Sequence, residues 1–111
     1  MTIPRLILGS TSPYRKKLLA SLGVTFTQMQ PDTDESPNPG ENPSSLASRL
    51  GVSKAQSVAD QLQNEAHWIC IGSDQVCHLG RRLYGKPGTA DQAARQLAAF
   101  SGRWVTFSTS L

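Results

Sequence analysis

The sequence contains no long apolar run and no clustered positive charge. No stretch approaches the roughly 20 apolar residues that a bilayer-spanning helix needs. The apolar segment near the start, residues 6–9, is too short for the core of a signal peptide. These absences argue against a membrane span and predict a cytoplasmic location.

Aromatic residues are few and the basic residues are scattered. The formal net charge is +3 and the isoelectric point is about 9.2, which weakly favours an anionic partner. No Lys/Arg-rich arm of the kind that binds nucleic acid is present. Aromatic residues make up 6% of the chain and do not cluster with basic ones. We therefore expect no nucleic-acid partner.

Cysteine and histidine are also scarce, and their spacing does not indicate a zinc site. The two cysteines, Cys70 and Cys77, lie near His67 and His78, but neither a CxxC nor an HxxxH spacing occurs. In a cytoplasmic chain the two cysteines are expected to be reduced, buried thiols.

The 111 residues are enough for one domain, which we take to span 1–111. Short apolar runs alternate with amphipathic segments, and this order predicts an α/β fold, with a mixed sheet flanked by helices. The expected strands are residues 6–9, 24–29, 68–72 and 103–108, and the expected helices are 13–22, 45–65 and 89–102. Residues 31–43 and 80–87 are expected to be loops.

The chain ends directly after the last expected strand. An uncovered strand edge is a liability that natural folds usually manage. We therefore expect a domain truncated at its C-terminus, or one completed by a partner chain.

The turn between the first strand and the first helix is a candidate anion site. Ser10 and Ser12 precede a helix whose first N–H groups lack partners, and the helix dipole adds about half a positive charge there. Arg15 and Lys16 stand in the first turn, where a bound polyphosphate would make basic residues favourable. The alternative is an ordinary serine cap followed by solvated charges.

Lys54 is a second candidate. On a helical wheel it lies within about 40° of Leu50 and Val58, near the face expected to be buried. An unpaired ammonium there would be costly. Its side chain either extends to water along its stem or enters a cleft and meets an anion.

Carboxylates and one further lysine complete the candidate set. Asp74 ends the apolar run 68–73, where ligands bind in open α/β sheets, and could hold a metal or accept a proton from water. Glu35 lies in an acidic, proline-rich loop, and Lys86 stands between Gly85 and Pro87. A turn aspartate, a solvated loop and an exposed lysine are the simpler alternatives. Together the residues offer cations for a polyphosphate and carboxylates for a metal.

The sequence resembles the Maf family. The resemblance rests on an ordered set of motifs that covers almost the whole chain, namely 6–16 (LILGSTSPYRK), 34–35 (DE), 53–55 (SKA), 72–75 (GSDQ), 85–87 (GKP) and 101–102 (SG). Maf proteins are metal-dependent nucleoside triphosphate pyrophosphatases of the Maf/ITPase-like fold. Members continue well beyond the last strand of this chain.

The resemblance implies roles for individual residues. Asp74 would be the catalytic group that activates water, and Glu35 and Asp74 would hold a divalent cation, Mg²⁺ or Mn²⁺. The substrate phosphates would be bound by Ser10, Ser12, Arg15, Lys16, Lys54 and Lys86. Many members have arginine at the position of Lys16. The lysine of this chain keeps the positive charge but loses the bidentate geometry with which arginine binds a phosphate. The resemblance leaves open whether the protein forms a homodimer.

The branch of the family is indicated by Ser73-Asp74-Gln75, because members acting on dTTP and UTP more usually have Ala-Asp-Thr there. The Ser-Asp-Gln form, with an aromatic such as Tyr14 after Ser-Pro, is similar to the 7-methyl-GTP pyrophosphatases. Tyr14 could stack on the cationic base, and Gln75 could bond its edge. The alternatives are a dTTP/UTP pyrophosphatase and a truncated remnant that binds nucleotide without turnover.

Overall fold

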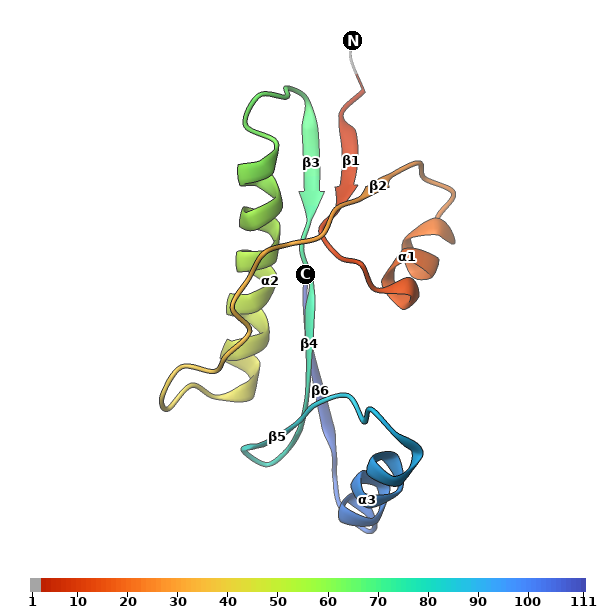
Figure 1. Ribbon diagram of the computed structural model, residues 1–111, viewed down its shortest axis with the longest axis vertical. Helices are drawn as coiled ribbons and strands as arrows, with labels where there is room; N and C mark the ends of the chain where they lie inside the picture. The colour runs from red at the N-terminus through yellow and green to blue at the C-terminus, as the bar shows by residue number, and fades with distance from the viewer. Residues whose placement is uncertain (1–2) are drawn as a thin grey trace.

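The computed structural model describes residues 3–111 and has an α/β architecture (Figure 1). Its strands form two three-stranded sheets, one parallel and one antiparallel. The elements in chain order are β1 (Arg5–Leu8), α1 (Pro13–Ala20), β2 (Thr27–Gln28), α2 (Pro43–Gln61), β3 (Trp68–Ile71), β4 (Asp74–Leu79), β5 (Arg82–Tyr84), α3 (Ala90–Phe100) and β6 (Thr106–Ser110). The predicted combination of parallel and antiparallel strands flanked by helices is confirmed.

The parallel sheet has the order β2-β1-β3 and contains one of the two core clusters. Strand β1 pairs along its full length with β3, from Arg5 opposite Trp68 to Leu8 opposite Ile71. Ile7 is fully buried, because it packs with Val58 and Leu62. The strand expected at 24–29 forms only the two-residue β2, and β3 lies at the edge of this sheet.

The antiparallel sheet has the order β5-β4-β6, and two of its three strands, β4 and β5, were not expected from the sequence. Strands β4 and β5 form a hairpin with Leu79 opposite Arg82, so its turn has only two residues. Gly80 has a φ of 58°, which such turns require of their first residue. The prediction of a loop over 80–87 was therefore wrong at 82–84, and β6 begins three residues later than the strand expected at 103.

Helix α2 is the element that packs against both sheets, on one side of the strands (Figure 1). It begins at Pro43, because the Asn42 side chain accepts a hydrogen bond from the Ser45 N–H at 2.8 Å. Leu46, Ala47 and Leu50 pack with Val76 of β4 in the second core cluster. The same helix therefore supplies both halves of the core.

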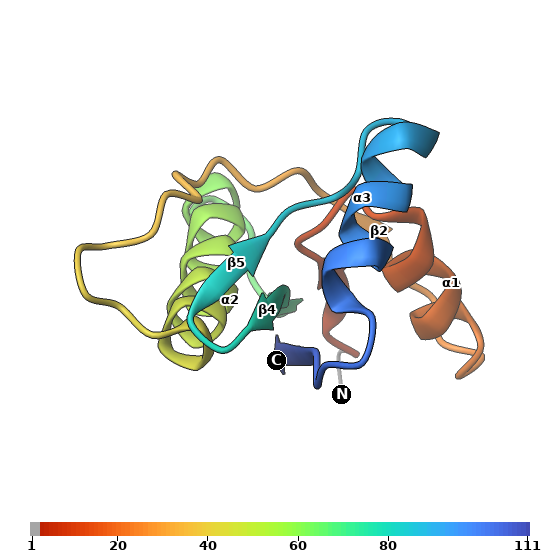
Figure 2. The same cartoon turned by 90° about the horizontal axis from the view of Figure 1, so that it is seen from below.

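Helices α1 and α3 lie on the other side of the strands from α2 in both views (Figures 1 and 2). Ser12 caps α1, since its side chain accepts from the Arg15 N–H. Helix α3 is capped by Thr89, whose side chain accepts from the Gln92 N–H. No residue of α1 is buried, and Leu18 is 70% exposed. Among residues 3–111, no helix is long and apolar enough to cross a bilayer.

Candidate functional site

Four polar residues among those described are buried, and they gather where β1 and β3 end beside α2. They are Ser10, Lys54, Ser73 and Asp74. The Gly9 N–H donates to the Ile71 carbonyl at 2.8 Å, so the segments that follow β1 and β3 start side by side. This arrangement agrees with the general rule that ligand sites of open α/β sheets lie beyond the carboxyl ends of strands.

Lys54 is the centre of this cluster. Its Nζ donates to Asp74 Oδ1 at 2.8 Å and lies 2.8 Å from Glu35 Oε1. The side chains of Lys54 and Asp74 are each 10% exposed, whereas that of Glu35 is 62% exposed. Burial alone would lower the pKa of Lys54, but the hydrogen bonds to Asp74 and Glu35 raise it above its ordinary value. Two alternatives were predicted for Lys54, extension to water or contact with an anion. The structure shows contact with anions, and these anions are carboxylates of the chain itself.

Asp74 is held in place through the last strand, by a residue that the sequence did not single out. The Asp74 N–H donates to Ser110 Oγ at 3.1 Å, and Ser110 Oγ donates to the Ala47 carbonyl at 2.6 Å. Ser73 Oγ donates to the Ser110 carbonyl at 2.6 Å. Asp74 begins β4, so the prediction that it ends the preceding strand was wrong. The break at Gly72 and Ser73 lets the chain change from one sheet to the other.

The close approach of α2 to this break depends on glycine. A Cβ on Gly72 would contact the Gly51 carbonyl oxygen and would come within 2.6 Å of the Ala55 backbone nitrogen. A Cβ on Gly51 would in turn contact Ser110 Oγ. Glycine at both positions therefore brings the helix that carries Lys54 up to the strand that carries Asp74.

The loop that carries Glu35 is fixed by Arg49, a second residue that the sequence did not single out. The Arg49 guanidinium donates to both carboxylate oxygens of Glu41, at 2.8 and 3.0 Å, and to the Ser36 carbonyl at 2.9 Å. Glu41 also accepts from the Asn38 N–H at 3.1 Å. An arginine on a predicted helix close to an acidic loop was the available signal.

The turn after β1 forms a compact set of donors. Ser10 Oγ accepts from the Ser12 N–H at 3.1 Å and from Arg15 Nη1 at 3.4 Å, and the Ser10 carbonyl accepts from the Gln28 side chain at 3.1 Å. Arg15 therefore bends back toward the carboxyl end of β1. This half of the predicted anion site lies beside the buried cluster, while Lys16, on the same helical turn, is exposed.

Three other predicted site residues are not drawn into the cluster. Tyr14 is 78% exposed on α1, and Lys86 is exposed in the segment between β5 and α3. Gln75 accepts a hydrogen bond from Thr109 at 3.0 Å on the face of β4 opposite to Asp74, because successive side chains of a strand alternate. No hydrogen bond or ion pair among residues 3–111 joins Lys86 to Asp74.

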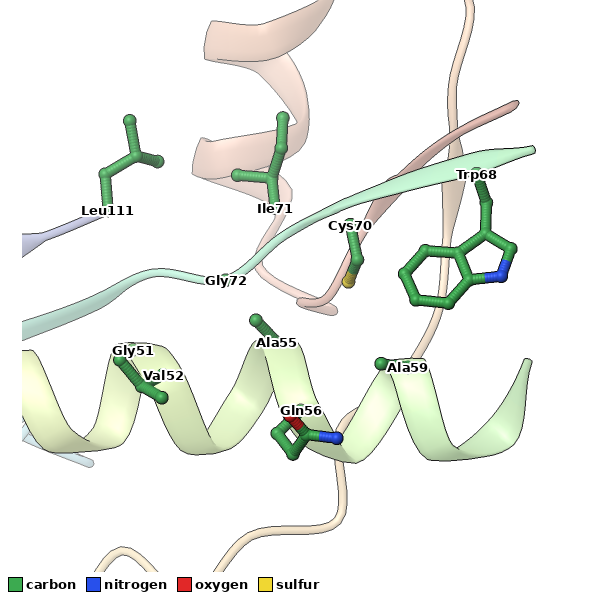
Figure 3. Close-up of a pocket in the computed structure, with 10 residues that line it drawn as sticks. All are labelled: Gly51, Val52, Ala55, Gln56, Ala59, Trp68, Cys70, Ile71, Gly72 and Leu111. Atoms are coloured by element: carbon green, nitrogen blue, oxygen red, sulfur yellow. The ribbon is translucent and has the colours of Figure 1, made fainter. Parts of the chain in front are cut away.

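Two hollows flank α2, and neither contains the polar cluster. One is a groove of about 540 Å³ between α2 and β3 (Figure 3). Trp68 and Cys70 point toward α2 in it, whereas Ile71 points away. The other, of about 920 Å³, is lined by α2 and residues 32–34. Neither is lined by Lys54 or Asp74.

Comparison with known proteins gives a family match across residues 5–111, to a model described as "Maf-like protein". The chain belongs to the Maf family. Similar proteins include that of Xanthomonas oryzae pv. oryzae (strain MAFF 311018), 51% identical over 98% of this chain and 56% of the relative. That of Cupriavidus pinatubonensis is 48% identical over 98% of this chain and 53% of the relative. Both are named 7-methyl-GTP pyrophosphatase. This Maf chain spans about half the length of the curated relatives it matches.

The divalent cation expected for a Maf protein has a partial set of ligands here. No group of three or more His, Cys, Asp or Glu side chains able to hold a metal occurs within 3–111. Asp74 and Glu35 nevertheless present carboxylate oxygens at 2.8 Å from one common nitrogen. Mg²⁺ is often held by one or two carboxylates together with substrate phosphates and waters. The pair therefore fits a cation that shares its coordination with a nucleotide.

Proposed function

We propose that this chain belongs to a metal-dependent nucleotide pyrophosphatase that converts 7-methyl-GTP into 7-methyl-GMP and pyrophosphate. One observation carries the proposal, the buried Lys54–Asp74 pair beside Ser10 at the carboxyl ends of β1 and β3. A carboxylate and an ammonium next to a turn of N–H donors suit an anionic substrate whose hydrolysis requires proton transfer. The names of the relatives support the same reaction and the same nucleotide.

In this mechanism Asp74 accepts a proton from the water that attacks the α-phosphorus in line with the departing pyrophosphate. The hydrogen bond that the Asp74 N–H donates to Ser110 Oγ fixes the backbone of Asp74, which keeps the carboxylate in position during proton transfer. Ser10, Ser12 and Arg15 bind phosphate oxygens through the turn after β1, and Lys54, Lys16 and Lys86 neutralise negative charge on the leaving group. Asp74 and Glu35 would hold the Mg²⁺ or Mn²⁺ ion, which when bound supplies activation of the water and charge neutralisation.

The preference for a methylated base is assigned to Tyr14 and Gln75. The 7-methylguanine ring is cationic, and an exposed tyrosine ring is free to lie against it, a contact that contributes about 0.5 to 2 kcal/mol. The side-chain amide nitrogen of Gln75 is a donor for the edge of the base or the sugar, because only its oxygen is bonded to Thr109. The cytoplasmic location and a homodimer stay predictions.

The experiment is to mix the purified chain with 7-methyl-GTP, dTTP or UTP in Mg²⁺ or Mn²⁺ and to measure pyrophosphate. We expect the fastest release from 7-methyl-GTP. Asp74→Asn is expected to lower the rate by about 10² to 10⁴-fold while nucleotide binding is retained. The matched control is Asp60→Asn on the exposed surface of α2, which should leave the rate unchanged.

Two results would contradict the proposal at different levels. Faster release from dTTP or UTP would refute the 7-methyl-GTP branch but leave a pyrophosphatase. Full activity in Asp74→Asn would refute the role of Asp74.

A second candidate is nucleotide binding without turnover, favoured by the position of Lys86 outside the cluster. In that case 7-methyl-GTP raises the melting temperature measured by circular dichroism, and no pyrophosphate is released.

A further inference from the structure

The Lys54 ammonium lies between the two carboxylates that the proposed function assigns to the metal. Glu35 Oε1 and Asp74 Oδ1 each lie 2.8 Å from the same Nζ. The two oxygens are therefore no more than twice that distance apart. A divalent cation held through these two oxygens would lie about 2.0 to 2.1 Å from each of them. Such a cation would lie next to the Lys54 ammonium, which is bonded to the same two oxygens.

The charges of these side chains make simultaneous occupation unfavourable. The Lys54 ammonium offsets one of the two negative charges that Asp74 and Glu35 would otherwise present to a cation. A divalent ion bound next to Nζ would be repelled by it, and this repulsion is strong because Lys54 and Asp74 are largely shielded from water. The cation and the ammonium therefore compete for one place.

The surroundings indicate which group moves. Asp74 is fixed through Ser110, and the Lys54 backbone belongs to a helix packed on both sheets. The Lys54 side chain, by contrast, has four rotatable bonds, and Ser10 and Arg15 lie at the carboxyl end of the neighbouring strand. A phosphate bound at that turn would offer the ammonium a second anionic partner.

We propose that Lys54 acts as a gate for the metal: it keeps the cation off Asp74 and Glu35 until a nucleotide phosphate accepts the ammonium. This inference rests on the proposed function and adds an order to it. Nucleotide and metal then bind as a coupled pair, and each raises the affinity of the other by the same factor. In the alternative, Lys54 only neutralises a buried acid, and the metal binds elsewhere or not at all.

The test is a titration with Mn²⁺ in the absence of nucleotide, in which free Mn²⁺ is followed by electron paramagnetic resonance. Wild type is compared with Lys54→Gln, which keeps a hydrogen-bond donor, and with Lys54→Met, which keeps only the stem. The matched control is Lys17→Met, which removes the same charge from the exposed surface of α1. Circular dichroism establishes whether each variant is folded. If Lys54→Met is unfolded, the comparison with wild type uses Lys54→Gln.

We expect both Lys54 variants to bind Mn²⁺ at least about tenfold more tightly than wild type, and Lys17→Met to match wild type within about twofold. In wild type, an analogue of 7-methyl-GTP with a methylene group between the α- and β-phosphorus should tighten Mn²⁺ binding by about the same factor. In Lys54→Gln the tightening should be smaller.

The gate is overturned if the folded Lys54→Gln variant binds Mn²⁺ no more tightly than wild type. It is also overturned if wild type binds Mn²⁺ equally tightly with and without the analogue. Neither measurement requires turnover. A chain that passes both tests but releases no pyrophosphate would refute the proposed reaction and leave the gate intact, so the two failures are distinguishable.

Discussion

The contact between Gly72 and α2 makes a quantitative prediction about stability. In the Gly72→Ala variant the new Cβ would contact the Gly51 carbonyl oxygen, and would lie 2.6 Å from the Ala55 nitrogen and 2.7 Å from the Ala55 Cβ. All three atoms belong to one rigid helix, so no flexible side chain can move aside. Overpacking of this kind costs about 1 to 3 kcal/mol.

For a domain of about this size, 1 kcal/mol shifts the melting temperature by about 4 to 8 °C. We therefore expect Gly72→Ala to melt at least about 4 °C below wild type, as measured by circular dichroism. Because the helix must move away from the strand, the Lys54–Asp74 pair should lengthen as well. Gly85→Ala is the matched control, since a Cβ there meets nothing within 4 Å and it should melt with wild type. A Gly72→Ala variant as stable as the control would refute the packing argument.

Two further predictions concern the supports of the site. Ser110→Ala removes the acceptor of the Asp74 N–H and should lower the free energy of unfolding in urea by about 1 to 3 kcal/mol. The control is Ser44→Ala, at an exposed position of α2, which should leave that free energy unchanged. Equal effects of the two substitutions would contradict the role of Ser110. The hydrogen bonds from Arg49 hold the pKa of Glu41 below its ordinary value of 4.5. The stability that this ionised carboxylate contributes is present above pH 4.5 and is lost as the pH falls. Glu41→Gln should therefore melt at a lower temperature than wild type at pH 7 but at the same temperature at pH 3. A difference that persists at pH 3 would contradict the contribution of the Glu41 charge.

The sequence predicts the elements whose signals are local. Ser12 before Pro13, and Thr89 three residues before Gln92, mark the heads of α1 and α3, because a cap needs only its own turn. The apolar run of β1 predicts a buried strand for the same reason. The fully buried Ile7 agrees with that prediction.

The β4–β5 hairpin is not predictable in the same way. Strand β4 contains Gln75, Cys77 and His78 among its apolar residues, so its alternation is weak. The chain passes directly from β3 into β4 across Gly72, and the sequence alone suggests one strand ending at an aspartate. Pairing with β6, 28 to 36 residues away in the chain, places β4 in the second sheet.

The candidate site is predictable as a set of residues but not as an arrangement. The helical wheel places Lys54 near the buried face, and it is buried. That it pairs with Glu35 as well as Asp74 depends on how Arg49 fixes an irregular loop, which no periodicity reveals. Ser110 could not be found from a motif, because its role follows from strand pairing.

Helix α2 also determines how the molecule should come apart. It packs against β3 in one sheet and against β4 and β6 in the other, so neither sheet keeps its core once the helix detaches. Both sheets then belong to one cooperative unit, and the slowest amide hydrogens of β1 and β4 should exchange with solvent at the same opening free energy.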